Sequence, residues 1–335
     1  MSEENDKSTL TYDASDEYRP GPPPAPEIPA WKDGSLRIGI HTSIAGDIAG
    51  ALDIAHGLGA NTLQIFSSSP RMWGHGSSRI SEVEAARFRA RRRELALGPL
   101  VIHCNYLINL ASPNPVLRTR SVQAFHQEIV RAIALGADFL VLHPGSAHGS
   151  DSGAAIAAIA QGLKQAARGL RLGELRILLE NTAGQGSSIG SKFEELKAIV
   201  DACPELRLGV CIDTAHTFAV GWDIGTKEGW DAALAEIDRT LGLARVAVVH
   251  MNDSKTALGS RVDRHEHIGK GKIGLEAFGR ILNPGDDKRN VAALWRLTGH
   301  VVRATGDGMK PRHKKGTASK MKADARRKNK RPRGK

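Results

Sequence analysis

The chain has 335 residues, 41% of them hydrophobic, so it can form a substantial core in one large domain or two ordinary ones. It contains no run near the roughly 18 apolar residues of a membrane-spanning helix, and its N-terminus lacks the basic start and apolar centre of a signal peptide. Its three cysteines are an odd number in or near hydrophobic runs, which argues against a disulfide framework. We therefore expect a globular cytoplasmic protein without membrane contact.

The net charge of +11 is concentrated at the C-terminus. Residues 309–335 contain 13 Lys or Arg and one Asp, a net +12, which leaves −1 for the rest of the chain. A basic block without apolar periodicity is typical of a disordered tail that binds nucleic acid, and it also fits a tail that only improves solubility. Residues 1–34 are acidic and then rich in proline. We predict a disordered arm over 1–34, a folded domain over 35–302 and a disordered basic tail over 303–335.

From Leu36 onward, short apolar runs alternate with longer amphipathic stretches. The runs predicted as strands are LRIGIH, TLQIFS, LVIHCN, FLVLHPG, RILLENT, RLGVCID and VAVVHMN. Continuous apolar strands separated by helices predict a parallel sheet that is covered on both faces. An open sheet would carry a glycine-rich phosphate loop after the first strand, but GIHTSIAGDIAG lacks the G-x-G-x-x-G spacing. The fold class predicted is therefore α/β, a TIM-type (β/α)8-like barrel.

The eighth unit of this barrel departs from the pattern. The helical segment LEAFGRILN is followed by PGDDKRN and a helical VAALWRLTG, and no apolar strand lies between Asn283 and Val291. We therefore predict a defect or a substitution at strand 8, with an open edge between the first and seventh strands.

Side chains that can bind a metal follow these strands. Active residues of TIM-type barrels lie at the carboxyl ends of the strands, and the residues at those ends here are His41, His103, His143, Glu180, Asp213 and His250. His216 follows Asp213 at a spacing of three, and Asp263 and His265 lie in the loop after the last apolar run. Imidazoles and carboxylates gathered without thiolates indicate a catalytic rather than a structural metal.

Glu180 lies in the middle of this set, and its two oxygens could bridge two ions. Two metals about 3.5–4 Å apart can stabilise the attacking and leaving oxygens of a phosphoryl displacement. The same ligands could hold a sugar for isomerisation, and the residues alone do not separate these two functions.

Several long motifs make the chain resemble a known family from Leu36 to about Asn283. They are HCNYLINLASP, LHPGSAHG, LLENTAGQGSSIG, GVCIDTAHTFAVGWDI and HMNDSKTALGSRVDRHEHIGKGKIG. The family is endonuclease IV, the apurinic/apyrimidinic-site endonuclease of the xylose-isomerase-like barrels. The resemblance implies hydrolysis of the phosphodiester 5′ to an abasic site in double-stranded DNA, leaving a 3′-hydroxyl and a 5′-deoxyribose phosphate. We expect a monomer that associates with the nucleoid through DNA.

The resemblance also implies a site with three Zn²⁺ ions, in which Glu180 is the catalytic bridging ligand. The implied ligand sets are His103, His143 and Glu180; Glu180, Asp213 and His250; and His216, Asp263 and His265. His41 matches a histidine that the family does not use as a ligand. The family's eighth strand ends in a glutamate that completes the second set and has no evident counterpart here, so we expect two or three zinc ions.

Three further residues are implied to contact DNA. Arg71, Tyr106 and Leu107 align with residues that enter the gap in the duplex. On sequence alone the last two are more typical of a core, and only the resemblance reverses that interpretation. Two alternatives stay open: a metal-dependent sugar isomerase or epimerase on the same fold, and a DNA-binding derivative of the nuclease that is catalytically impaired by the missing strand.

Overall fold

The computed structural model describes residues 37–73, 80–282 and 300–303. The predicted arm over 1–34 and the predicted tail beyond Arg303 lie outside these residues, as does the segment between Asn283 and Val291 in which no strand was predicted. Across the described part of the chain, no helix has the length and apolar character needed to cross a membrane.

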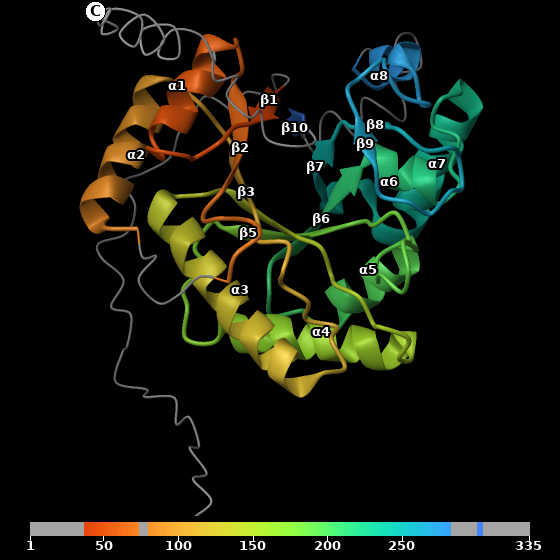
Figure 1. The fold of residues 1–335 in the computed structure, drawn as a ribbon, viewed down its shortest axis with the longest axis horizontal. Coiled ribbons are helices and arrows are strands. Elements are labelled where there is room, and N and C mark those ends of the chain that lie inside the picture. Colours follow the sequence, from red (N-terminus) through yellow and green to blue (C-terminus); the bar gives the residue numbers. More distant parts are fainter. Residues whose placement is uncertain (1–36, 74–79, 283–299, 304–335) are drawn as a thin grey trace, which may run out of the picture.

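A closed barrel of parallel strands forms the centre of the molecule, and helices surround it (Figure 1). Its order is β1-β10-β7-β6-β5-β4-β3-β2. The strands are β1 Arg37–His41, β2 Thr62–Phe66, β3 Leu100–His103, β4 Phe139–Leu142, β5 Arg176–Glu180, β6 Leu208–Asp213, β7 Val246–His250 and β10 His300–Arg303. The predicted TIM-type fold is confirmed.

Strand β10 closes the barrel, so the predicted open edge was wrong. Its backbone pairs in parallel with β1, from Arg37 opposite His300 to Ile40 opposite Arg303. On its other side, residues 301 and 302 pair with β7. The eighth strand therefore lies further along the chain than the segment between Asn283 and Val291, and it is the substitution at strand 8 that the sequence left open. A pair of valines suits this position, because β-branched residues favour strands.

The helices follow the strands in alternation. They are α1 Gly50–Gly57, α2 Glu82–Glu94, α3 Pro115–Leu135, α4 Ser152–Ala167, α5 Phe193–Asp201, α6 Thr214–Ala219, α7 Lys227–Leu241 and α8 Leu275–Leu282, with a 3-10 turn, η2, at Leu243–Arg245. Local signals set their ends. Ser81 and Glu84 form a capping box at the start of α2, and Asn114 caps α3 before a proline at its first position.

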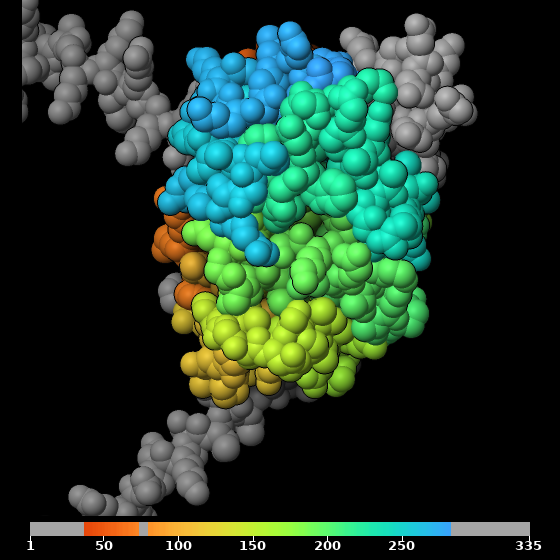
Figure 2. All heavy atoms as spheres, turned by 90° about the vertical axis from the view of Figure 1, so that its right-hand side faces the viewer, coloured from red at the N-terminus to blue at the C-terminus, as the bar shows by residue number. Residues whose placement is uncertain are grey.

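A short antiparallel ladder lies outside the barrel after β7. It pairs β8, Asp253–Ser254, with β9, His265–Glu266, and so forms a hairpin over residues 253–266. The segment that follows β7, drawn in blue, lies on the surface beside the teal and green chain of α6 and α7 (Figures 1 and 2).

Two apolar clusters show which way the strand residues face. The larger cluster joins the helices to the outer face of the strands. The smaller one contains strand residues alone and fills the barrel interior: Val101, Phe139, Val141, Leu178, Cys211, Ala247 and Val248. Side chains of a strand alternate between its two faces, so residues two positions further on also point into the barrel.

Candidate metal centre

Five of the predicted ligands form the next layer of side chains above this interior cluster. Each follows an interior residue by two positions, and the five are His103, His143, Glu180, Asp213 and His250. All except His143 are buried. The alternation along the strands therefore brings the ligand-type residues of five strand ends into one layer at the carboxyl mouth of the barrel.

Glu180 lies at the centre of this layer with its two oxygens facing different histidines. Oε2 lies 3.2 Å from Nε2 of His103 and 3.1 Å from Nε2 of His143. Oε1 lies 2.8 Å from Nδ1 of His250 and 3.8 Å from Nδ1 of His216. The side chain is buried, and its two oxygens point in different directions. Each oxygen could bind a different cation, so Glu180 could bridge two metal ions.

A second group forms where α6 meets the hairpin. The Nε2 atoms of His216 and His265 are 3.3 Å apart, and the carboxylate of Asp263 lies 3.4 Å from the first and 3.2 Å from the second. Two ring nitrogens and a carboxylate directed at one point suit a shared cation or proton. The hairpin thus brings Asp263 and His265 next to the buried His216 of α6.

Asp213 joins the two groups. It is fully buried, and its Oδ1 caps the start of α6 by accepting a hydrogen bond of 2.9 Å from the backbone N–H of His216. Its Oδ2 accepts one of 2.5 Å from the Asn252 amide and lies 3.8 Å from Nε2 of His265. Asp213 also lies opposite His250 in the pairing of β6 with β7.

Three sets of candidate ligand atoms lie within 4.8 Å of one another: His103, His143 and Glu180; Asp213, His216 and His265; and Glu180, Cys211 and His250. The sequence had not suggested Cys211. Burial raises the pKa of its thiol well above the ordinary value, and the nearby carboxylates raise it further. Without a metal the thiol is therefore neutral. Asp213, which was expected beside Glu180 and His250, is grouped with His216 and His265 instead.

Hydrogen bonds to backbone carbonyls orient two of the histidines. Nδ1 of His103 donates to the carbonyl of Cys104 at 2.7 Å, and Nδ1 of His216 donates to that of Asn181 at 2.7 Å. In each ring the protonated nitrogen is therefore Nδ1, and Nε2 faces the carboxylates. This is the usual way in which a protein presents a histidine to a metal.

The electrostatics of the layer favour cations. Burial works against ionisation of Glu180, yet His250 and His143 hold the pKa of its carboxyl well below the ordinary value. Burial likewise opposes a charge on His216, but Asp213, Asp263 and Glu180 outweigh it and raise the pKa of the ring to about 10. Buried carboxylates that stay ionised need positive charge beside them, and metal ions would supply it. The residues present therefore fit a metal centre.

His41 takes no part in the three sets. It ends β1, and its ring lies 4.5 Å from that of Phe66. Burial, followed by repulsion from His103 and His250, lowers the pKa of His41 to about 3, so the ring is neutral.

The residues implied to contact DNA lie on two adjoining loops. Tyr106 is 57% exposed, which excludes a core role, and its ring lies 5.4 Å from that of His103. Arg71 is also exposed, whereas Leu107 is half-buried. The Asn105 amide joins the loops by donating to the carbonyls of residues 69 and 72 at 2.8 and 2.6 Å. Sequence patterns did not single out Asn105, because its role depends on a loop distant in the chain.

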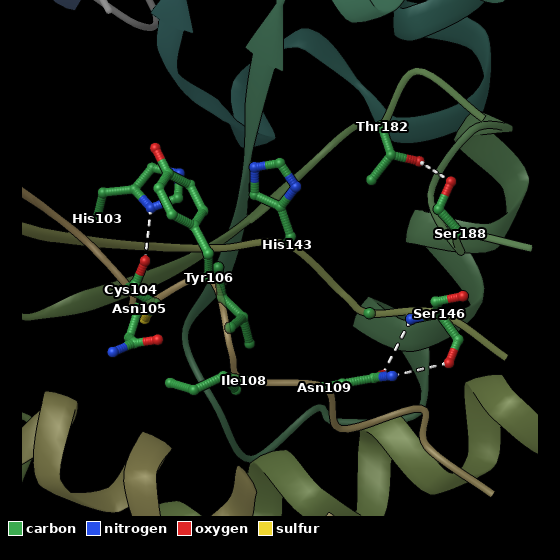
Figure 3. Close-up of a pocket in the computed structure, with 12 residues that line it drawn as sticks. His103, Cys104, Asn105, Tyr106, Ile108, Asn109, His143, Ser146, Thr182 and Ser188 are labelled. Atoms are coloured by element: carbon green, nitrogen blue, oxygen red, sulfur yellow. Dashed lines mark hydrogen bonds between the residues drawn. The ribbon is translucent and has the colours of Figure 1, made fainter. Parts of the chain in front are cut away.

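A cavity of about 220 Å³ lies beside His103 and His143 (Figure 3). Tyr106 lies in front of the His103 ring, and the opposite wall is polar. There Thr182 donates to Ser188 at 3.3 Å, and the amide of Asn109 binds both the N–H and the carbonyl of Ser146 at 3.0 Å. A polar ligand seated here would contact two of the candidate metal ligands.

Comparison with known proteins identifies the family. A family model described as a xylose isomerase-like TIM barrel matches residues 52–290. The "Probable endonuclease 4" of Solibacter usitatus is 47% identical over 285 residues, which cover 79% of this chain and 97% of that protein. The chain belongs to the endonuclease 4 family. The predicted DNA repair endonuclease, a nuclease of the hydrolase class, is confirmed at the level of this family, whose members depend on metal.

Solved structures agree with membership of the endonuclease 4 family. The crystal structure of endonuclease IV from Thermus thermophilus is 37% identical, has a TM-score of 0.69, and matches over 82% of this chain and 93% of its own. D-psicose 3-epimerase from Clostridium cellulolyticum is 15% identical with a TM-score of 0.55, over 82% and 87% of the two chains. That second likeness shows a shared fold and gives the alternative of a sugar epimerase no support from the residues.

Proposed function

We propose that this protein is a zinc-dependent endonuclease that hydrolyses the phosphodiester 5′ to an abasic site in double-stranded DNA, leaving a 3′-hydroxyl and a 5′-deoxyribose phosphate. The observation that carries the proposal is the Glu180 carboxylate, whose two oxygens face separate pairs of histidines. This is the arrangement of a bridging ligand in a site with more than one metal. The similarity to endonuclease 4 proteins supports the same conclusion.

Zinc would be held by the three sets that the sequence suggested. These are His103, His143 and Glu180; Glu180, Asp213 and His250; and His216, Asp263 and His265. When bound, the ions supply a hydroxide near neutral pH and stabilise charge on the leaving oxygen. The sequence contains no glutamate after Glu276, so strand β10 cannot supply one to the second set. Two or three zinc ions per chain are proposed, and the second set would be the weakest.

The protein's own side chains would hold and orient the substrate. Tyr106 is exposed beside His103. Arg71 lies on a neighbouring loop, which Asn105 connects by hydrogen bonds to the loop of Tyr106. An aromatic ring and a guanidinium at this place can fill the gap left by a missing base, while the sugar-phosphate turns towards the metal ligands. We propose that the protein does this as a monomer at the nucleoid, in the cytoplasm.

Replacement of Glu180 with glutamine tests the proposal. The variant should lose bound zinc and cleavage of a duplex with a single abasic site, because it removes a charge shared by two cations. Elemental analysis would give zinc per chain, and gel electrophoresis would give the cleavage rate. Glu205→Gln is the matched control, because Glu205 is exposed and pairs with Lys164 at 3.1 Å, away from the candidate ligands.

Three outcomes separate the alternatives. Wild-type protein that contains two or three zinc ions and cleaves the abasic duplex would support the proposal. Bound zinc without cleavage would favour the impaired DNA-binding derivative. Absence of any transition metal, with no cleavage after zinc is added, would refute a metal-dependent nuclease.

A further inference from the structure

Gln64 is a buried polar residue in the same layer as the metal ligands, although it belongs to none of the candidate ligand sets. It lies in β2, opposite His41 of β1, and is 1% exposed. Its amide contacts two histidines: Oε1 lies 2.8 Å from Nε2 of His250, and Nε2 lies 3.1 Å from Nδ1 of His41. A continuous hydrogen-bonded chain therefore runs from His41 through Gln64 to His250.

This chain determines which nitrogen of His250 is free for a metal. An amide oxygen can only accept, so Nε2 of His250 carries the proton that it donates to Gln64. In a neutral imidazole the other nitrogen then holds the lone pair. That nitrogen is Nδ1, which lies 2.8 Å from Oε1 of Glu180 and therefore faces the metal layer.

His250 differs in this respect from the other two oriented histidines. His103 and His216 each donate to a backbone carbonyl, which cannot change from acceptor to donor. The partner of His250 is a side-chain amide, and rotation of that amide by half a turn would present its NH₂ group instead. The NH₂ group would require Nε2 of His250 to accept, and Nδ1 would then carry the proton and lose its lone pair for the metal.

His41 is the partner of the amide on its other side. In the orientation seen, the Nδ1 lone pair of His41 accepts from the Gln64 NH₂ group, and Nε2 of His41 is buried without a hydrogen-bond partner among the described residues. The ring packs against Phe66. With its NH₂ group on the His41 side, the amide has its oxygen on the side of His250.

We propose that Gln64 is a positioning residue of the metal centre, whose amide oxygen holds His250 in the tautomer that binds metal through Nδ1. The inference rests on the proposed function, because it assumes a metal beside Glu180 and His250. It concerns the second set, to which β10 adds no glutamate, so the orientation of His250 matters most there. Loss of such an outer hydrogen bond typically weakens metal affinity roughly 10- to 100-fold.

Three variants test the role of Gln64 through zinc binding rather than activity. Gln64→Leu removes both hydrogen bonds, and the affinity for the most weakly held zinc should fall roughly 10- to 100-fold. Gln64→Glu keeps an oxygen acceptor for Nε2 of His250 and should retain the zinc affinity of the wild type, even if the buried charge lowers thermal stability. Val101→Ala is the matched control, because Val101 is a buried apolar residue of β3 that lies opposite Gln64 in the sheet.

The measurements are zinc dissociation constants, from competition with a chromophoric chelator, and the visible absorption spectrum of the cobalt-substituted protein. The proposal expects a changed spectrum in Gln64→Leu alone. Equal zinc affinity in Gln64→Leu and wild type, or an equal loss in all three variants, would overturn it. If the wild type binds no zinc, both the role of Gln64 and the proposed function are overturned. If the wild type binds zinc and only the expected effect of Gln64→Leu is missing, the role of Gln64 alone is overturned.

A measurement on the wild type applies even if Gln64→Leu does not fold. Long-range ¹H–¹⁵N spectra of the zinc-loaded protein distinguish protonated from metal-bound ring nitrogens. We expect His250, assigned by comparison with His250→Asn, to carry its proton on Nε2. A proton on Nδ1 would refute the proposal.

Discussion

Replacement of Asp253 with asparagine should loosen the hairpin that brings Asp263 and His265 to the metal layer. The Asp253 carboxylate is fully buried at the start of that hairpin and accepts four backbone N–H groups. The donors to Oδ1 are Ser254 at 2.8 Å and Ile273 at 2.9 Å, and those to Oδ2 are Gly269 at 3.0 Å and Gly271 at 2.9 Å. One carboxylate thus fastens both ends of the segment that carries the two ligands.

The size of the effect follows from these four bonds. Asparagine keeps the shape, but one of its two terminal atoms becomes an NH₂ group that cannot accept. Two of the hydrogen bonds are then lost, and two backbone N–H groups face another donor. A hydrogen bond to a charged group contributes about 1.5–3 kcal/mol, and water can reach the two partly buried glycine N–H groups, so the lower value applies. We expect the free energy of unfolding to fall by about 3 kcal/mol.

Urea denaturation followed by circular dichroism would measure this loss, with a chelator present so that zinc affinity does not contribute. Asp231→Asn is the control, because Asp231 pairs with Lys227 at the surface of α7 at 2.6 Å and should change stability by about 0.5 kcal/mol or less. Zinc per chain should also fall in Asp253→Asn. A loss below about 1 kcal/mol would show that the four N–H groups find other partners, and the reasoning would be refuted.

Three further predictions concern charge, DNA and the tail. The pKa of His216 lies at about 10 in the folded protein against an ordinary 6.5, so its imidazolium stabilises the metal-free fold below pH 6.5, and this contribution disappears as the pH rises towards 10. Urea denaturation at about pH 6 and about pH 9 should show the decrease, and a decrease of equal size in His216→Asn would contradict the assignment. Tyr106→Ala should leave the melting temperature unchanged, because the ring is 57% exposed, and should weaken binding to abasic duplex roughly 10-fold in fluorescence anisotropy. Equal weakening on intact duplex would argue against a role at the lesion. Deletion of residues 309–335 should weaken binding to intact and abasic DNA alike and flatten the salt dependence, because Lys and Arg contacts to phosphate are independent of sequence. An unchanged salt slope would mean that the tail does not contact DNA.

The sequence predicted most of the barrel because the signal is periodic. Seven apolar runs alternate with helices, and six of the runs end at or near a His, Asp or Glu, so strand positions and their inward-facing residues follow together. Strand β10 escaped prediction because it has four residues and directly follows VAALWRLTG, which was predicted as helical. Four residues give too few alternations to stand out, and only pairing with β1 and β7 identifies them.

The supporting residues of the site were harder to predict than the candidate ligands. Gln64 and Asn105 are amides in otherwise ordinary strand and loop contexts, and their partners lie on other strands and loops. Tyr106 illustrates the opposite difficulty, since its apolar neighbours suggest a core and the ring is exposed. Hydrogen-bond partners distant in the chain are set by the closed fold, and periodicity along one strand carries no information about them.

The strand that closes the barrel, β10, lies on a different part of the chain from the candidate metal ligands. All eight candidate ligands precede Glu266, and the closing strand pairs through its backbone with β1 and β7. Parallel ladders use N–H and C=O groups that every residue except proline offers. The amino-acid sequence of the closing strand can therefore change while the ligands stay as they are. During synthesis, a nascent chain would hold every candidate ligand before it could close the ring.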